Sequence, residues 1–311
     1  MSPMDRRTFL TSAATLAGAC ALPRAAGAAG AKTRLILLGT GGGPRPRKAS
    51  SASAQVVIAN GTPYVIDCGD GVARQLVLAD VPLAKLRHVF LTHHHSDHNA
   101  GYGNLLLLAW TAGLRSRVDT WGPPPLAAMT RQFFALNRFD IDTRIADEGR
   151  VPLLPLVHAH ELARAGMVLR DENVTVTAAL VHHPPVVPAF AYRFDGHDRS
   201  IVISGDTTRS DTLIALARDA DVLVHEVLYP AAIDRLVAGL PNGERLKRSI
   251  VAHHTAAEDV GRVAQAAQVK TLVLSHFVPA EDREVTDQMW LDAVARHFGG
   301  RIILGRDLLE I

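Results

Sequence analysis

The sequence predicts one α/β domain with β-sheets inside and helices outside, and three observations lead to this prediction. Short apolar segments, typical of buried strands, alternate with segments of helical pattern along most of the chain. Of the 311 residues, 48% are hydrophobic and 21% are charged, which provides enough apolar surface for a large core. No interior stretch resembles a linker between domains. Alternating strands and helices around one core are typical of a layered α/β architecture.

Residues 1–31 have the layout of a twin-arginine export signal. Arg6 and Arg7 precede a weakly apolar run rich in Ala, Leu and Thr, and small residues follow it. We therefore predict a signal segment over residues 1–31, one domain over residues 32–311 and a periplasmic location. Because no apolar run reaches about 18 residues, no membrane span is expected. A short amphipathic helix and lipidation at Cys20 are the alternatives for this segment.

The predicted mature chain is electrically neutral. Residues 1–31 contain three of the 33 basic side chains and one of the 31 acidic ones, so 30 of each remain. Because binding to a nucleic-acid backbone needs clustered Lys and Arg, this balance predicts no nucleic-acid partner. With Cys20 in the signal segment, Cys68 is left without an internal disulfide partner.

The first third of the chain predicts a strand, a hairpin and further alternating elements. The first strand, at 34–38, stops at the glycine-rich segment 39–43. Asn60-Gly61 is a strong turn signal and predicts a hairpin between two apolar segments. The predicted hairpin strands are 55–59 and 64–67, followed by a helix at 72–79, a strand at 89–92 and a helix at 104–110.

Regular alternation is weaker in the middle and returns near residue 174. Prolines between residues 123 and 155 predict a helix plus loops that cover one side of the site. Thr255 and Glu258 have the spacing of a capping box and predict a helix from there to about Gln268. The remaining predicted elements are strands at 174–181, 190–194, 201–204, 222–227, 271–275 and 301–304, and helices at 212–218 and 285–297.

A cluster of ligand side chains directly follows the strand at 89–92. His93, His95, Asp97 and His98 have the spacing H-x-H-x-D-H, and imidazole and carboxylate groups suit Zn²⁺ and related divalent ions. Alternate residues of an extended segment point the same way, so His93 and His95 can share one metal while Asp97 and His98 turn toward another. By the same alternation His94 points away. The alternative is an exposed His-rich loop.

Three further candidate ligands stand at the ends of later strands. They are His183, Asp206 and His276, and ligands at strand ends on one edge of a sheet arrangement converge. We expect Asp206 to bridge two metal ions, because neighbouring cations repel and need shared negative charge. His182 competes with His183, and we choose His183 because it immediately precedes Pro184-Pro185, where the chain turns into the site.

Five motifs occur in a fixed order along the chain. They are Gly39-Thr40-Gly41-Gly42, Asp67-Cys68-Gly69-Asp70-Gly71, H-x-H-x-D-H, Ser204-Gly205-Asp206-Thr207 and Leu274-Ser275-His276-Phe277. In this order they resemble the metallo-β-lactamase superfamily and, more narrowly, its branch of ribonuclease Z and zinc-dependent arylsulfatases. The resemblance implies an αββα sandwich with two mixed sheets inside and helices on the outer faces, and a hydrolase domain over residues 32–311.

The resemblance also implies roles for the candidate residues. It assigns His93, His95 and His183 to a first metal and Asp97, His98 and His276 to a second, with Asp206 bridging. The metals are two divalent ions, with Zn²⁺ preferred and Mn²⁺ or Fe²⁺ compatible with the same ligands.

As a ligand and hydrogen-bond acceptor, Asp97 is also expected to orient the attacking hydroxide. Glu226 and His254 match a Glu and a His that lie beside the metals in ribonuclease Z relatives, and they are expected to stabilise or protonate the leaving oxygen. The alternative is that Glu226 and His254 only pair to tie two elements together.

The expected function is that of an exported metal-dependent hydrolase that cleaves a small ester, an aryl sulfate or a phosphodiester. Ribonuclease Z relatives usually carry a protruding arm that grips transfer RNA, and residues 195–200 leave no room for one. This favours a small-molecule substrate without nucleic acid, with a homodimer possible. The alternatives are a lactonase or β-lactamase with the same metal site, ribonuclease Z-type RNA processing, and a non-catalytic periplasmic metal-binding protein.

Overall fold

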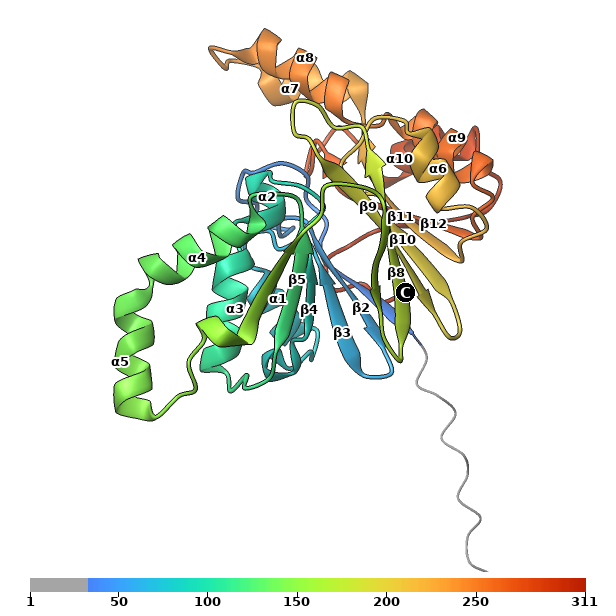
Figure 1. The fold of residues 1–311 in the computed structure, drawn as a ribbon. Helices are drawn as coiled ribbons and strands as arrows, with labels where there is room; N and C mark the ends of the chain where they lie inside the picture. The colour runs from blue at the N-terminus through green and yellow to red at the C-terminus, as the bar shows by residue number, and fades with distance from the viewer. Residues whose placement is uncertain (1–32) are drawn as a thin grey trace, which may run out of the picture. The chain divides into compact units, whose positions relative to one another are not determined.

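The computed structural model describes residues 33–311, in which two β-sheets pack face to face between outer layers of helices (Figure 1). The predicted signal segment at 1–31 lies outside the described residues, and export stays a prediction. None of the described helices is long and apolar enough to cross a bilayer.

The first sheet contains six strands in sequence order, β1 to β6. Its first three strands are antiparallel, and β3 to β6 run parallel. Asn60 and Gly61 join β2 to β3 with φ angles of 48° and 78°, the left-handed pair that a tight hairpin turn requires, which confirms the predicted hairpin. The strands are β1 Arg34–Gly39, β2 Ala54–Ala59, β3 Thr62–Ile66, β4 His88–Phe90, β5 Val118–Gly122 and β6 Val157–Glu161.

The second sheet contains seven strands in the order β13-β12-β11-β10-β9-β8-β7. Strands β7 to β10 are antiparallel, whereas β10 to β13 are parallel. The inner strand β11 is buried along its whole length, as parallel strands covered on both faces are. The strands are β7 Gly166–Arg170, β8 Val174–Val181, β9 Ala189–Gly196, β10 Ser200–Ile203, β11 Val222–Leu228, β12 Thr271–Val278 and β13 Arg301–Leu304.

Helices cover the outer face of each sheet and complete the predicted αββα sandwich. One apolar cluster fills the space between the sheets, and two others lie between a sheet and its helices. The first sheet carries α1 Val72–Leu78, α3 Tyr102–Thr111, α4 Leu126–Leu136 and α5 Arg138–Glu148. The second carries α6 Asp211–Leu216, α9 Ala257–Ala266 and α10 Asp287–Ala295. Three single-turn 3₁₀ helices lie at Leu83–Lys85, Leu154–Leu156 and Pro230–Ala232.

The middle of the chain differs from the prediction. Instead of one helix and loops over the site, it forms β5, β6, β7, α4 and α5. Helix α4 contacts β6, and Leu126 and Phe134 of α4 and Ile141 of α5 belong to the core outside the first sheet. The prolines that suggested loops occupy the connections between these elements, for example Pro123 to Pro125 between β5 and α4.

The capping box predicted at Thr255 does not form. Helix α9 begins at Ala257, its cap position is Ala256, and no side chain caps it. The Thr255 amide donates to Oε1 of Glu226 at 3.0 Å, and its hydroxyl donates to the carbonyl of Thr207 at 2.5 Å. These long-range hydrogen bonds use the groups that the local motif needs.

Two helices that the sequence pattern did not predict follow β11. They are α7 Ile233–Val237 and α8 Gly243–His253, which contact each other and project beyond the ends of the second sheet (Figure 1). Their apolar side chains, such as Ile233 and Ile250, form a small separate core with Leu228 and Val278. This pair of helices therefore stands beside the edge at which the ligand-bearing strands end.

Candidate metal centre

The candidate ligands meet at one edge of the sandwich. The segment after β4 carries His93 to His98, and a one-turn helix, α2 Ser96–Asn99, presents Asp97 and His98. Strands β8 and β10 both run antiparallel to β9, so their carboxyl ends lie at the same edge and bring His183 close to Asp206. His276 lies within β12, beside the register shift at Glu226 of β11.

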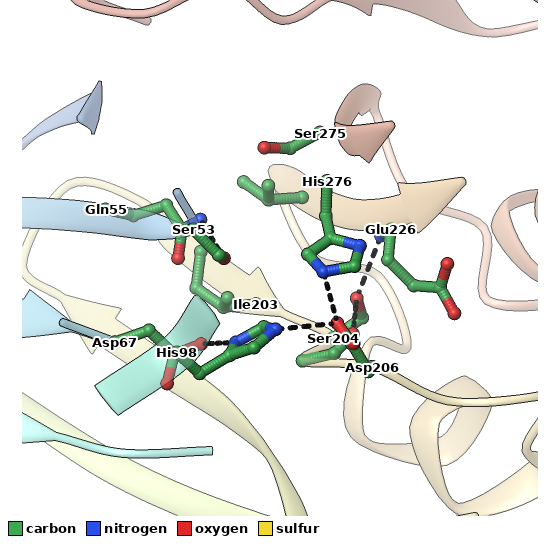
Figure 2. A pocket seen from close by; sticks show the side chains of 12 residues that line it. Ser53, Gln55, Asp67, His98, Ile203, Ser204, Asp206, Glu226, Ser275 and His276 are labelled. Atoms are coloured by element: carbon green, nitrogen blue, oxygen red, sulfur yellow. Dashed lines mark hydrogen bonds and ion pairs between the residues drawn. The ribbon is translucent and has the colours of Figure 1, made fainter. Parts of the chain in front are cut away.

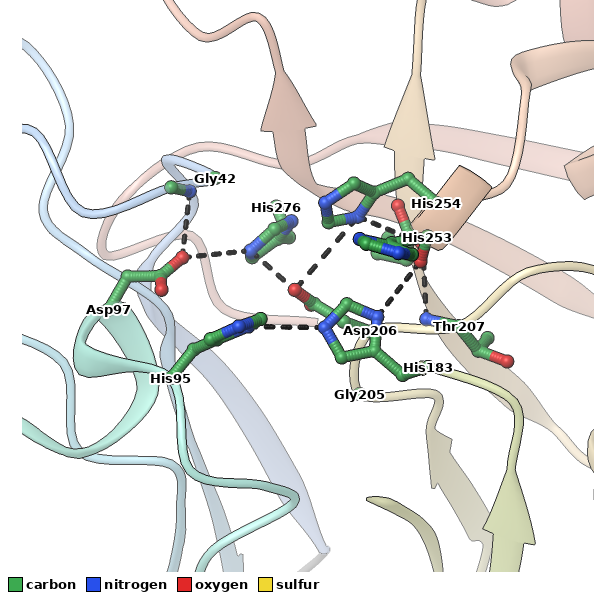
Figure 3. A network of polar contacts seen from close by, with 12 residues as sticks. Gly42, His95, Asp97, His183, Gly205, Asp206, Thr207, His253, His254 and His276 are labelled. Carbon is green, nitrogen blue, oxygen red and sulfur yellow. Dashed lines mark hydrogen bonds and ion pairs between the residues drawn. The ribbon is translucent and has the colours of Figure 1, made fainter. Parts of the chain in front are cut away.

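The first group of donors contains His93, His95, His183 and Asp206, whose ligand atoms all lie within 4.8 Å of one another. Nδ1 of His95 is 3.1 Å from Nε2 of His93. The same nitrogen is 3.1 Å from Nε2 of His183 (Figure 3). Oδ2 of Asp206 is 3.8 Å from Nε2 of His93. Three imidazole nitrogens and one carboxylate oxygen form a donor set that suits Zn²⁺.

The second group contains Asp97, His98, Asp206 and His276. Oδ1 of Asp206 is 3.2 Å from Nε2 of His98 and 3.3 Å from Nε2 of His276, and Oδ2 of Asp97 is 3.3 Å from the same His276 nitrogen. Nε2 of His98 and Oδ1 of Asp206 are buried without a hydrogen-bond partner in residues 33–311. Because buried polar atoms are normally partnered, this arrangement fits a cation held between these atoms. Asp206 turns one oxygen toward each group.

A second layer of hydrogen bonds fixes the orientation of the imidazole rings. Oδ2 of Asp67 lies 2.7 Å from Nδ1 of His98, and Oδ1 of Asp67 accepts from the amide and hydroxyl of Thr92. The carbonyl of His253 accepts from Nδ1 of His183 at 2.9 Å. With Nδ1 engaged, Nε2 of His98 and His183 faces the centre. The contact of Asp67 with His98 was not predicted from the sequence, although Asp67 opens the Asp67–Gly71 motif directly after β3 and so stands at a strand end like the predicted ligands.

The glycine-rich loop after β1 packs directly against His276. A Cβ atom on Gly42 would lie 2.7 Å from Nδ1 of His276, which is closer than side chains approach one another. The Gly42 amide donates to the carbonyl of Phe277 at 3.2 Å, and the Gly43 amide donates to Oδ2 of Asp97 at 2.7 Å. This loop therefore holds Asp97 through a hydrogen bond, and the lack of a side chain at Gly42 leaves space for the ring of His276.

Burial and neighbouring charges set the protonation of the donors. Burial holds the pKa of His93 well below its ordinary value and lowers the pKa of His183 to about 4. Burial alone would raise the pKa of Asp206, but the imidazoles of His276 and His98 outweigh it and hold that pKa well below the usual range. Neutral imidazoles and an ionised carboxylate are the forms that bind metal, so His93, His183 and Asp206 are already in those forms. Burial alone would lower the pKa of His98, but Asp206 and Asp67 outweigh it and raise that pKa well above its ordinary value, so His98 has to release a proton when it binds metal.

Glu226 and His254 lie together beside these groups. Oε1 of Glu226 is 3.3 Å from Nδ1 of His254 and accepts from the amides of Thr207 and Thr255 at 3.2 and 3.0 Å. Glu226 thus ties two loops together and also contacts His254. Burial opposes a charge on His254, but Glu226 outweighs it and raises the pKa of His254 to about 9.

A cleft of about 570 Å³ opens above the donors. Its floor contains His95, Asp97, His183 and Asp206, and the loop from Gly42 to Arg47 forms one wall. Helices α7 and α8 form the opposite wall, which is largely apolar. A second cavity of about 10 Å³ lies among Asp67, His98, Asp206 and Glu226, deeper between the sheets (Figure 2). The larger cleft has room for a substrate much larger than a water molecule.

The structure brings all of the predicted site residues to this edge. The seven candidate ligands are His93, His95, Asp97, His98, His183, Asp206 and His276. His183 is buried, whereas His182 is exposed. His94 points away from the donors, since its Nε2 lies 2.7 Å from the carbonyl of Pro123.

Comparisons with known proteins give relatives over most of the chain. Residues 62–277 match the family described as beta-lactamase superfamily domain. Ribonuclease Z of Mycobacterium bovis (strain BCG / Pasteur 1173P2) is 33% identical over 280 residues, which cover 89% of this chain and 97% of the relative. Ribonuclease Z of Mycobacterium sp. (strain KMS) is 34% identical over 281 residues, 89% of this chain and 95% of the relative.

Solved structures share the fold. Human tRNase Z, short form, has a TM-score of 0.66 at 22% identity and covers 89% of this chain and 98% of its own. The metallo-beta-lactamase fold protein YhfI from Bacillus subtilis has a TM-score of 0.65 at 19% identity and covers 90% and 98%.

The expected small-molecule ester substrate and the expected absence of a nucleic-acid partner are wrong. Relatives named ribonuclease Z match this chain over 95–97% of their own length, so a missing arm does not separate the chain from them. The neutral net charge misled for a physical reason, because a sum over the whole chain does not describe the field at one cleft.

Proposed function

The chain belongs to the metallo-β-lactamase superfamily, in its ribonuclease Z branch, and from this membership we propose that it is a metal-dependent endoribonuclease that hydrolyses a phosphodiester bond of transfer RNA. The observation that carries the proposal is the 33% identity over 97% of a ribonuclease Z. The donor groups and the cleft above them support it, since they offer a place for a phosphodiester beside two metal sites.

We assign the two donor groups to two Zn²⁺ ions. His93, His95 and His183 would hold the first, Asp97, His98 and His276 would hold the second, and Asp206 would contribute to both. When bound, the ions supply Lewis acidity and lower the pKa of a water molecule toward neutrality. Imidazole and carboxylate donors also accept Mn²⁺ or Fe²⁺, so metal analysis has to distinguish these ions.

Asp97 has a positioning task in addition to its place in the donor set. Its Oδ2 accepts a hydrogen bond from the Gly43 amide, which fixes the carboxylate at the cleft floor. From there it accepts a hydrogen bond from the attacking water and orients a lone pair of that water toward phosphorus. Orientation of this kind lowers the activation barrier, because the entropy needed to align the water with phosphorus is lost when the substrate binds and not in the reaction step.

His254 is the proposed general acid. Its Nδ1 faces Glu226, and the residue also lines the cleft, where a leaving oxygen needs a proton as the P–O bond breaks. Glu226 stabilises the imidazolium, so His254 holds a proton to donate. Glu226 can join the two loops and still stabilise a protonated His254. Its Oε1 accepts hydrogen bonds from the Thr207 and Thr255 amides, and the negative charge of the same carboxylate acts on His254.

A cleavage assay tests the proposal. Zinc-loaded protein is incubated with a 3′-extended transfer-RNA transcript, and we expect one cut that EDTA abolishes and added Zn²⁺ restores. The same protein is assayed on bis(p-nitrophenyl) phosphate to show that its metal centre is active. Hydrolysis of the small diester without any RNA cleavage would overturn the ribonuclease assignment.

A further inference from the structure

Helix α8 forms a wall of the cleft through one of its faces. The residues of α8 that line the cleft are Leu246, Ser249, Ile250 and His253, which recur at the spacing of a single helical face. His253 stands at the metal centre, since its carbonyl accepts from Nδ1 of His183. A nucleic-acid strand that placed one phosphate at the donors and the next beside this wall would run along α8.

The flank of α8 next to this face carries Arg245, and Arg248 stands beside Arg245, farther from the cleft. At about 100° per residue, Arg245 lies about 40° from Ser249, whereas Arg248 lies about 60° beyond Arg245 and about 100° from Ser249. Both are exposed, and within residues 33–311 neither forms an ion pair or donates a hydrogen bond. Glu244 stands one turn before Arg248, yet no ion pair joins the two in that part of the chain.

The other flank of α8 is different. Lys247, which points away from Arg245 and Arg248, is paired with Asp234 of α7. Its charge is therefore already compensated within the protein. The two arginines are the basic groups of this helix that remain available to an outside anion, as judged from the described residues.

The position of the arginines suits phosphates next to the one at the metal centre. With a rise of about 1.5 Å per residue, Arg248 and Arg245 lie roughly 7 and 12 Å along the helix from His253. An RNA strand carries a phosphate at every nucleotide, and a guanidinium binds phosphate oxygens through paired N–H groups. We propose that Arg245 and Arg248 bind the phosphate backbone of the RNA where it leaves the cleft. This inference rests on the proposed function.

The connection between β9 and β10 strengthens the argument. Strand β9 ends at Gly196 and β10 begins at Ser200, so no arm projects there to hold RNA outside the cleft. Contacts beyond the cleft have to come from another element. Helix α8 is adjacent to the cleft, projects beyond the sheet (Figure 1) and presents two uncompensated positive charges.

The salt dependence of cleavage tests this inference. The values of kcat/KM for a 3′-extended transfer-RNA transcript are measured between 50 and 300 mM KCl for the wild type and for Arg245→Ala/Arg248→Ala. The matched control is Arg74→Ala/Arg131→Ala, which also removes two exposed helix arginines that are unpaired within residues 33–311 and do not line the cleft. Circular dichroism and zinc content establish that each variant is folded and loaded.

The double variant is expected to lose about tenfold in kcat/KM at low salt. Its plot of log kcat/KM against log [KCl] is expected to be shallower by about 0.7 to 0.9 per arginine, while the control keeps the wild-type slope. Equal slopes for all three proteins would overturn the role of α8 and leave the proposed function standing. If the wild type cleaves no RNA, the proposed function fails, and this inference fails with it.

Discussion

Oε1 of Glu226 lies 3.3 Å from Nδ1 of His254, and the same oxygen accepts hydrogen bonds from the amides of Thr207 and Thr255, which lie in two separate loops. A carboxylate that both anchors loops and stabilises an imidazolium has two effects when it is replaced. Substitutions that preserve the anchor are therefore needed to reveal the chemical effect.

His254→Ala is expected to lower kcat by about 10²- to 10⁴-fold, the range for loss of a general acid. Glu226→Gln keeps an oxygen that can accept hydrogen bonds from the amides of Thr207 and Thr255 but removes the negative charge. It is expected to lower kcat strongly as well. Both variants should bind as much zinc as the wild type by elemental analysis. An unchanged kcat in either variant would remove that residue from the mechanism.

The neighbouring histidines at 182 and 183 provide a matched pair of substitutions. His183→Ala removes a buried nitrogen from the first donor group, so we expect weaker zinc binding and loss of RNA cleavage. His182→Ala removes an exposed side chain, and zinc content should remain at the wild-type level. Equilibrium dialysis followed by elemental analysis measures both. Zinc loss in the His182 variant instead would reverse the ligand assignment.

Gly42→Ala tests the support that the glycine-rich loop gives to His276. The added Cβ would lie 2.7 Å from Nδ1 of His276 and 2.7 Å from a methyl group of Val278, so the ring has to move. We expect the number of tightly bound zinc ions per chain to fall from two toward one. Gly299→Ala is the control, because a Cβ there meets nothing within 4 Å. Two zinc ions in both variants would show that the loop does not position His276.

Asp221 connects the starts of three strands and predicts a pH dependence of stability. Oδ2 of Asp221 accepts from the amide and hydroxyl of Ser200, and its Oδ1 accepts from Nζ of Lys270 at 2.6 Å. Burial alone would raise the pKa of Asp221, but Lys270 and Ser200 outweigh it and lower that pKa. A carboxyl with a lowered pKa stabilises the folded state above its unfolded pKa of about 3.9, and this contribution is lost as the pH falls through the folded value.

Asp221→Ala is therefore expected to cost about 1 kcal/mol at pH 7 and less at pH 3. Urea unfolding at the two pH values measures the difference in unfolding free energy. Asp147→Ala, at an exposed helix position without an ion pair in residues 33–311, should leave stability unchanged at both. The same loss at pH 7 and pH 3 would mean that packing, not charge, accounts for the effect of Asp221.

The sequence predicted the fold and the donor groups where the signal was local or stood at a strand end. His93 to His98 occupy one short segment, and His183, Asp206 and His276 each follow or end an apolar run that is easily recognised. Strands β6 and β7 were missed because they are short edge strands whose residues are all exposed or half-exposed. Thr255 misled because its amide and hydroxyl bond to Glu226 and Thr207, which lie far away in the sequence.

The substrate class could not be predicted from the amino-acid composition. Equal numbers of acidic and basic residues say nothing about where those residues lie, and the exposed arginines of α8 became visible only once the helix was placed beside the cleft. Helix α8 itself was missed, since it belongs to a small core of its own rather than to either sheet.

Asp206 has one further consequence for how the centre fills. Its two oxygens face different donor groups, so on the proposed two-metal assignment the affinities of the two sites for metal are expected to be coupled. Whatever factor the first ion imposes on the affinity of the second, the second imposes on the first, because this reciprocity is required by thermodynamics. On the proposed two-metal assignment, the two sites are therefore expected to fill as a coupled pair, and the amount of half-loaded enzyme at limiting zinc is expected to depend on the carboxylate that they share.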